Sequence, residues 1–462
     1  MPTSNHARQS DDSKELERGL GLLPATALNM IDMVGIGPFI VGPLVIQAMG
    51  GPQALLAWAA GAVLAALDGC VWAELGTAMP KAGGSYVFLR EAYGPARWGK
   101  LLSFLFIWQT LIQAPLVIAS GAIGFSEYFT FLTPLGTVGQ KCVSAALVLA
   151  LIGLLYRRIT EIGKISVLLW IGVIATMAWI IFGGLTHFHS ELAFTYPAGA
   201  WNLSWVFFAG LGAGMVQTIY AYLGYYNICN LGSEIRDPEK NIPRGIFLSI
   251  AGIAVLYLAM QTSILGVVPW REAAGSKFVV SEFMQRIYGS RAAQGATIMI
   301  LWVAFASMFS TLLGYSRVPY AAARDGNFFR IFARVHPSKS FPYVSLLVLG
   351  GAAFLFSLLF RLRDVISAIL AMRLLVQFVG QAIGLMLLHR RWPAGRLPFK
   401  MWLYPVPVLV SICGWVALFL STGRKFALGG LLVISAGVIV YLTQAFIRSE
   451  WPFAEERAEV EL

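Results

Sequence analysis

Two charged side chains lie within stretches of sequence that are otherwise apolar enough to cross a membrane. Asp32 falls in the run 22–48 and Arg373 in the run 364–388. A charge is unfavourable at membrane depth, so an ionisable residue there is interpreted first as part of a substrate or ion pathway. Asp32 can bind a substrate ammonium group, carry a coupled proton, or pair with a basic side chain. Arg373 can contact a substrate carboxylate or form an ion pair with Asp32 or Asp68.

The first apolar run is interrupted by the sequence Gly-Ile-Gly-Pro at positions 35–38. Helix breakers leave backbone groups without partners, and in a membrane this persists only where the backbone is buried in protein or lines a polar cavity. Proline suits the first position of a helix, so the outer half-helix is expected to begin at Pro38. The amides of Gly37, Phe39 and Ile40 would then face the gap, and such a helix N-terminus binds carboxylates.

The run 204–231 has a comparable interruption at Gly224, within the sequence Tyr-Leu-Gly-Tyr-Tyr-Asn. Its outer half would end in free carbonyl groups near residues 220–223, which suit an ammonium group. Together the two interruptions predict a site for a zwitterionic α-amino acid, in which amides bind the carboxylate and carbonyls bind the amino group. The alternative is that these glycines only allow helices to pack closely.

The composition indicates a membrane protein. Of 462 residues, 58% are hydrophobic and 12% are charged, and the mean hydropathy is +0.71, whereas a soluble domain has about 25% charged residues. The formal net charge of +11 follows the loops, so it does not indicate a nucleic-acid partner. The four cysteines have no CxxC spacing, and we expect no resident metal or cofactor.

Hydropathy predicts an all-α fold of twelve transmembrane spans. They fall near residues 22–48, 52–79, 84–126, 138–156, 163–184, 204–231, 244–268, 293–323, 342–360, 364–388, 402–420 and 426–447. The third span is longer than a bilayer needs, so residues 86–93 are expected at the interface. The polar, amphipathic segment 271–292 is expected to form a helix in an outer loop.

The distribution of basic residues predicts the orientation. With the N-terminus inside, 24 of the 34 Lys and Arg residues lie in inner segments and nine lie in outer loops. This bias predicts that both termini lie in the cytoplasm. We expect a multi-pass protein of the plasma membrane, or of the inner membrane in a bacterium.

Interrupted spans at positions one and six predict an internal repeat. Five spans are an odd number, so the second set of five enters the membrane from the opposite side, and a substrate would bind between the halves. The predicted organisation is an N-terminal tail at 1–20, a first repeat at 21–184, a second repeat at 204–390, two further helices at 400–448 and a C-terminal tail at 449–462.

Four segments in the expected order resemble the amino acid–polyamine–organocation (APC) superfamily of permeases, which has the LeuT-type fold. Residues 34–39 resemble the family's break in helix one, and 74–86 resemble the end of helix two and the start of helix three. Residues 224–244 are similar to the break in helix six and the inner loop that follows, and 316–326 resemble the inner end of helix eight. The last two spans and both tails carry no comparable motif.

The resemblance implies that the first break holds the substrate carboxylate, that the second holds the amino group, and that an aromatic side chain of helix six acts as a gate. Tyr222 is the preferred gate because it directly precedes the break, and Tyr220 and Tyr225 are alternatives. We therefore expect substrate binding at Gly35, Ile36, Gly37, Tyr220, Tyr222, Leu223, Gly224 and Asn227. Coupling or gating is expected at Asp32, Arg373, Tyr225, Gln377, Ser310 and Thr311.

Two departures from the family pattern weaken the carboxylate cradle. Ile36 replaces the usual serine, and Pro38 removes one amide. Ser307, Ser310 and Thr311 could bind sodium together with carbonyls of helix one. Hydroxyls in membrane helices more often bond their own backbone, so proton coupling or exchange is favoured and sodium is the alternative.

The sequence thus predicts a secondary active amino acid transporter that works by alternating access. The alternative is a polyamine or other organic-cation transporter on the same fold, which a pocket of net negative charge around Asp32 would favour. The chain has no HExxH, GxSxG or phosphate-loop motif, so we do not expect an enzyme. The side-chain specificity, the direction of transport and the oligomeric state do not follow from the sequence.

Overall fold

The computed structural model describes residues 16–359, 369–447 and 450–453. Within these ranges the chain is built from helices and short connections. The β-type pairing in the described residues is limited to two isolated bridges, Leu20 with Ile235 and Ala82 with Leu231. The predicted all-α class is therefore confirmed.

Eight helices of the described residues are long and apolar enough to cross a membrane. Six of them are the single helices α3 (Ala54–Ala78), α5 (Trp98–Phe129), α6 (Thr137–Leu155), α7 (Ile159–Thr186), α11 (Pro238–Leu265) and α20 (Arg424–Ile447). The seventh, Ser290–Arg324, consists of α14 (Ser290–Tyr315) and α15 (Arg317–Arg324). The eighth, Ile369–Arg391, includes the π-helical turn η3 (Leu374–Val379) and α18 (Gly380–Arg391). This number confirms a multi-pass membrane protein.

Two interrupted helices and two shorter apolar helices complete the bundle. α1 (Leu22–Met33) and α2 (Gly37–Met49) meet at a bend of 45° and together pass as a further span. α9 (Trp205–Tyr222) and α10 (Asn227–Asn230) are separated by a four-residue turn. The shorter apolar helices are α16 (Tyr343–Leu359) and α19 (Val406–Ser421).

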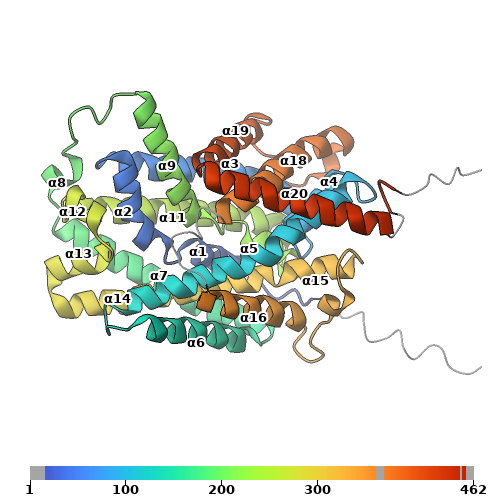
Figure 1. Cartoon of the computed structure of the whole chain (residues 1–462), viewed down its shortest axis with the longest axis horizontal. Helices are drawn as coiled ribbons and strands as arrows, with labels where there is room; N and C mark the ends of the chain where they lie inside the picture. The colour runs from blue at the N-terminus through green and yellow to red at the C-terminus, as the bar shows by residue number, and fades with distance from the viewer. Residues whose placement is uncertain (1–15, 360–368, 448–449, 454–462) are drawn as a thin grey trace, which may run out of the picture.

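The third predicted span differs from the structure at its start. The segment 84–126 is divided into α4 (Ser85–Ala92) and α5, which begins only at Trp98. The division follows from Gly94, whose φ of 89° lies in the left-handed region, and from Pro95, which cannot continue the helix before it. α5 lies across the bundle, and α4 lies near one end of it (Figure 1).

The predicted outer-loop helix is two helices. The segment 271–292 contains α12 (Trp270–Gly275) and α13 (Val279–Tyr288), and its last residues already belong to α14. Gly275 ends α12, and the following Ser276 adopts an extended conformation with ψ of 140°. A single amphipathic pattern therefore covers two short helices joined by a bend.

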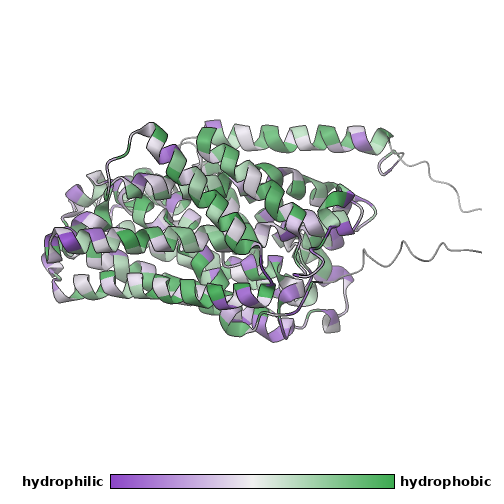
Figure 2. Cartoon of the chain, turned by 90° about the horizontal axis from the view of Figure 1, so that it is seen from below, coloured by the Kyte–Doolittle hydropathy of each residue, from purple (hydrophilic) through white to green (hydrophobic). Residues whose placement is uncertain are grey.

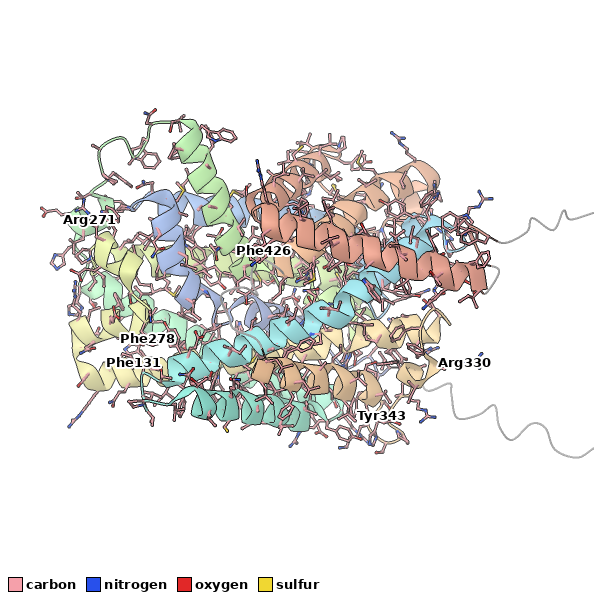
Figure 3. All side chains as sticks on the ribbon, viewed as in Figure 1. Phe131, Arg271, Phe278, Arg330, Tyr343 and Phe426 are labelled. Carbon is pink, nitrogen blue, oxygen red and sulfur yellow. The ribbon has the colours of Figure 1, made fainter. Side chains whose placement is uncertain are left out.

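The polar segments gather at the two ends of an elongated bundle. α8 (Ser190–Phe194), α12 and α13 lie at one end, whereas α4, α15 and the C-terminal end of α20 lie at the other (Figure 1). Hydrophilic residues are concentrated at these ends, and the long helices between them are largely hydrophobic (Figure 2). Arg271 and Arg330 mark the opposite ends (Figure 3). Segments predicted on the same side of the membrane therefore lie at the same end of the molecule.

The lateral surface of the bundle is apolar. Large aliphatic and aromatic side chains on the long helices are more than half exposed, which suits a surface that faces lipid. Examples are Leu149, Leu168, Phe182, Leu432 and Ile439. Inside this surface, α1 packs against α7, α11 and α14, and α2 packs along α9. The start of α9 is itself at the surface, since Trp205 is 84% and Val206 78% exposed.

Candidate substrate-binding site

The first helix break has the predicted position, but its free amides differ from those predicted. α1 ends at Met33 and α2 begins at Gly37. The Ile36 carbonyl accepts the amides of Phe39 (3.2 Å) and Ile40 (3.3 Å), so the expectation that these two amides face the gap is wrong. The amides of Ile36 and Gly37 have no acceptor among the described residues, and these two N–H groups are the available donors of the break.

The second break lies directly against the first. Gly224 has a φ of 125°, which L side chains rarely adopt, and a Cβ at this position would lie 2.8 Å from the Asp32 carbonyl carbon and from the Met33 nitrogen. Tyr257 joins the two breaks, because its hydroxyl lies 2.8 Å from the Met33 carbonyl oxygen and 3.1 Å from that of Ala221. The two interruptions therefore form one structural unit.

Carbonyl groups at the end of α9 remain available. The backbone oxygens of Tyr220, Tyr222 and Leu223 accept no hydrogen bond from the described residues. Unsatisfied carbonyls at a helix C-terminus carry partial negative charge and attract cations. The unit thus presents donors from one helix break and acceptors from the other.

Polar side chains brace the unit from neighbouring helices. The Asn29 amide donates to the Tyr225 carbonyl at 2.6 Å, and its oxygen accepts the amide of Ile228 at 2.9 Å. Asn227 donates to the hydroxyl of Ser310 at 2.8 Å, and this hydroxyl donates to the Leu28 carbonyl at 2.7 Å. These contacts hold α1, α10 and α14 together without reaching the cavity.

A cavity of about 70 Å³ lies between the breaks, which is several times the 10–15 Å³ that one water molecule needs. Nine residues predicted from the sequence line it: Asp32, Gly35, Ile36, Gly37, Tyr220, Leu223, Gly224, Thr311 and Arg373. Five other predicted residues are not part of the lining: Tyr222, Tyr225, Asn227, Gln377 and Ser310.

Asp32 lies on the wall of the cavity formed by α1. Its carboxylate accepts a hydrogen bond from the Thr311 hydroxyl, and its backbone carbonyl accepts one from Ser307 at 3.2 Å. Among the described residues, Asp32 has no cationic partner within 4 Å. The carboxylate is therefore held by neutral groups and is open to the cavity.

Arg373 lies on the same cavity and is only 3% exposed. It donates to Gln377 Oε1 at 2.9 Å and to the hydroxyl of Tyr226, and its guanidinium lies 5.2 Å from the centre of the Tyr226 ring. In the amide orientation that satisfies both groups, Gln113 Oε1 accepts from Arg373 at 3.1 Å. All of these partners are neutral. The carboxylate of Asp32 lines the same cavity but does not contact the guanidinium.

The two tyrosines beside the break that do not line the cavity are part of the packing around it. Tyr222 packs against Trp58 and Tyr257, with ring centres 6.1 and 5.2 Å away. Tyr225 donates to a carboxylate oxygen of Asp68 at 2.5 Å. The other oxygen of Asp68 accepts from the Trp415 indole at 2.9 Å, so this buried carboxylate ties α3 and α19 to the second break.

Several lining residues do not follow from the sequence. Tyr226, Tyr315, Met308, Val117, Gly121 and Ile369 are among them. Tyr226 lies in the same motif as Gly224, but an unwound segment has no helical period that could show which of its tyrosines points inward. The others come from long apolar helices whose sequence is too uniformly hydrophobic to identify one face.

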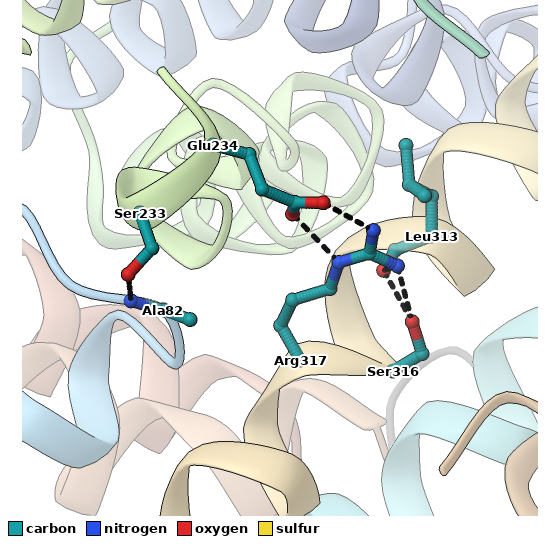
Figure 4. A network of polar contacts seen from close by, with 6 residues as sticks. All are labelled: Ala82, Ser233, Glu234, Leu313, Ser316 and Arg317. Atoms are coloured by element: carbon teal, nitrogen blue, oxygen red, sulfur yellow. Dashed lines mark hydrogen bonds and ion pairs between the residues drawn. The ribbon is translucent and has the colours of Figure 1, made fainter. Parts of the chain in front are cut away.

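A second polar network closes one end of the bundle. Glu234 accepts two hydrogen bonds from Arg317, at 2.7 and 2.8 Å, and Ser233 accepts the amide of Ala82 at 2.8 Å (Figure 4). The backbone of the same loop also holds the start of α1, because the amides of Gly19 and Leu20 donate to the Glu234 carbonyl. Helix one, the loop after α10 and α15 are therefore joined.

A cavity between two broken helices of a multi-pass bundle is the arrangement that secondary transporters use. The chain belongs to the amino acid permease family, whose model matches residues 20–443. The chain is 27% identical to the Asc-type amino acid transporter 1 of Mus musculus, over 94% of this chain and 82% of that protein. It is 26% identical to the serine/threonine exchanger SteT of Bacillus subtilis, over 86% and 90% of the two chains. It is 24% identical to the human cystine/glutamate transporter, over 95% and 87%. The resemblance stated from the sequence is confirmed.

Proposed function

We propose that this chain is a secondary active transporter of α-amino acids that works by alternating access. The observation that carries the proposal is the pair of helix breaks in contact around one cavity. One break offers the free amides of Ile36 and Gly37, and the other offers free carbonyls at the end of α9. A zwitterion places opposite charges on neighbouring atoms, so it matches both sets at once.

The charges of the cavity favour an amino acid over a polyamine. Asp32 alone would attract a cation, but Arg373 lies on the same cavity. The two charges cancel, and a polyamine would meet a buried guanidinium of its own sign. In our proposal Asp32 and the α9 carbonyls face the substrate amino group, and the amides of the first break bind its carboxylate. The relatives of this chain, which include a serine/threonine exchanger and a cystine/glutamate transporter, agree with an amino acid substrate.

The same proposal includes twelve spans and an inverted repeat. The eight uninterrupted helices, the bent pair α1–α2, the interrupted helix α9–α10 and the two shorter helices give twelve crossings. The first break lies in the predicted repeat 21–184 and the second in the repeat 204–390, with 400–448 as two added helices. Both tails, 1–20 and 449–462, would lie in the cytoplasm, and the protein would reside in the plasma membrane or a bacterial inner membrane.

We propose coupling to protons, or exchange, with Asp32 as the titrating group. Its carboxylate lies beside the substrate position and has no cation within 4 Å among the described residues. The hydroxyls that could bind sodium already donate to α1: Ser307 to the Asp32 carbonyl, Ser310 to the Leu28 carbonyl and Thr311 to the Asp32 side chain. This arrangement favours proton coupling, and sodium stays the alternative.

The test is uptake of labelled amino acids and polyamines by the purified protein in proteoliposomes, with and without sodium and at two pH values. Gly224→Ala should abolish amino acid uptake, because its Cβ would meet the backbone of α1 and its φ would be strained. Gly351→Ala is the matched control, since a Cβ there has open space. Normal uptake by Gly224→Ala would contradict the proposed binding site. If the parent protein takes up polyamines but no amino acids, it is an organic-cation transporter instead.

A further inference from the structure

A second cavity lies far from the helix breaks, at the end of the bundle that carries the predicted inner loops. It is a groove of about 700 Å³ between the turn that joins α6 to α7 and the loop before α16. The polar side chains that line it are Arg157, Arg158, Glu161, Ser338 and Lys339, together with Tyr156. None of these residues has a part in the proposed transport site.

The groove is built by contacts between the two loops. Lys339 donates to the Tyr156 carbonyl at 2.8 Å and lies 4.7 Å from the centre of the Tyr156 ring. Arg158 donates through Nε to the Ser338 carbonyl at 3.2 Å. His336 stacks on Phe341 at 5.5 Å, which holds the second loop in place. Two basic side chains are thereby fixed in the groove by backbone acceptors.

These contacts leave most of the cationic donors free. A lysine ammonium has three donors and an arginine has five. One donor of Lys339 is used, and the terminal nitrogens of Arg158 have no acceptor among the described residues. Arg157 is half exposed, and its nearest carboxylate is Glu161 at 3.8 Å. Three cations therefore face one carboxylate, which is an excess of positive charge in a preformed groove.

The groove also borders an apolar surface. α6 and α16 pack against each other, and both carry side chains that are largely exposed in the part of the bundle that would face lipid. Leu149 on α6 is 56% exposed, as is Leu355 on α16, and Leu347 is 44% exposed. Tyr343, the first residue of α16, and Arg330 lie toward the same end of the molecule (Figure 3). A ligand with an anionic head and long apolar chains would match both parts.

We propose that this groove binds the headgroup of an anionic phospholipid from the cytoplasmic leaflet. Arg157, Arg158 and Lys339 bind the phosphate, and the acyl chains lie along the apolar faces of α6 and α16. Clusters of basic side chains at the cytoplasmic interface attract anionic lipids. The bound lipid bridges the α6–α7 turn and the loop before α16, and it does not depend on which substrate the protein transports.

The experiment is native mass spectrometry of the full-length protein with phosphatidylglycerol, with phosphatidylethanolamine and with soluble glycerol 3-phosphate. We expect phosphatidylglycerol to bind, phosphatidylethanolamine to bind at least ten-fold more weakly, and glycerol 3-phosphate not to be retained. Arg157→Gln should weaken phosphatidylglycerol binding several-fold. The protein should still fold, since this side chain is half exposed and makes no contact that folding requires. The triple variant Arg157→Gln, Arg158→Gln, Lys339→Gln should abolish the preference for phosphatidylglycerol over phosphatidylethanolamine.

Arg330→Gln is the matched control, because Arg330 is an exposed arginine at the same end of the bundle and outside the groove. It should leave lipid binding unchanged. Equal loss of phosphatidylglycerol binding in Arg330→Gln and Arg157→Gln would overturn the proposal. The lipid would then be attracted by the overall positive charge of this end of the protein and not by the groove. Retention of glycerol 3-phosphate as tightly as the lipid would also overturn it, since the site would be one for a soluble phosphate.

Discussion

Two arginines among the described residues are almost fully buried, and they differ in what surrounds them. Arg317, 1% exposed, is bound by both carboxylate oxygens of Glu234, which is itself 0% exposed, and it also donates to Ser316 at 2.9 Å. Arg373, 3% exposed, contacts only neutral groups, and the carboxylate of Asp32 lines the same cavity without contacting it. Equal burial thus accompanies two different electrostatic environments.

The difference separates a structural charge from one available to a ligand. A buried ion pair with good geometry compensates its own desolvation, and removing one partner leaves an uncompensated charge. Arg317 fits this description. The charge of Arg373 is compensated by dipoles and an aromatic ring, so an anionic group that enters the cavity can still gain from it. The identity of the partners, rather than burial, distinguishes the two roles.

The largest effect is expected at the paired arginine. Arg317→Ala should destabilise the protein by about 3–5 kcal/mol, because it leaves Glu234 buried without a partner. Thermal unfolding of the purified protein measures this. The double variant Arg317→Met, Glu234→Leu should recover much of the stability, since no buried charge remains. If Arg317→Ala is as stable as the parent protein, Arg317 does not have a structural role that Arg373 lacks.

The second effect concerns transport rather than stability. Arg373→Gln should reduce amino acid uptake at least ten-fold, because the cavity then keeps only the charge of Asp32. The unfolding temperature should fall less than in Arg317→Ala, since no carboxylate loses a contact partner. Uptake by proteoliposomes and thermal unfolding measured side by side decide this. If Arg373→Gln unfolds as readily as Arg317→Ala, the two arginines have the same structural role.

A third effect should appear in the pH profile. Asp32→Asn keeps an oxygen that can accept from Thr311 but cannot release a proton. If protonated Asp32 is the transporting form, uptake by the parent rises as the pH falls through the pKa of this carboxyl, and the variant loses that dependence. Uptake measured from pH 5 to 8 tests this. An unchanged profile would show that another group carries the proton.

The smallest effect is expected from removing a single hydroxyl beside Arg373. Tyr226→Phe keeps the ring next to the guanidinium and removes one of its hydrogen-bond acceptors, whereas Gln377 and Gln113 still accept from Arg373. Uptake should fall two- to ten-fold. Tyr222→Phe is the control, because the Tyr222 hydroxyl has no partner among the described residues and lies outside the cavity lining. If Tyr222→Phe loses more uptake than Tyr226→Phe, the cavity is lined by other residues in the transporting state.

The sequence predicted the breaks better than the side chains around them. Gly and Pro restrict the backbone locally, so the end of α1 at Met33 and the turn at Gly224 could be located from residue type alone. The free amides were predicted less well. Of the three amides expected to face the gap, those of Phe39 and Ile40 donate to the Ile36 carbonyl. Which amide stays free depends on the local turn geometry, and residue types do not specify it.

The partners of the buried charges required the tertiary structure. The sequence offered Asp68 as one possible ion-pair partner of Arg373, but its carboxylate is bound instead by Tyr225 from the second break and by Trp415 from α19. These residues are 157 and 347 positions away in the chain. Hydrophobic periodicity predicts that a helix is buried, but in a membrane protein most faces are apolar, so it does not show which helices meet.

The backbone bridge at the start of α1 has a consequence for hydrogen exchange. The amides of Gly19 and Leu20 both donate to the Glu234 carbonyl, at 3.0 and 2.9 Å, and the Arg236 amide donates to the Leu20 carbonyl at 2.8 Å. Since Arg317 holds the Glu234 side chain, the start of α1 cannot swing away unless these bonds open together. Their amide protons should then exchange with solvent as one group, with a protection set by the free energy of opening this end of the protein. Hydrogen exchange at three amides would therefore report how readily this end opens, without any label on the substrate.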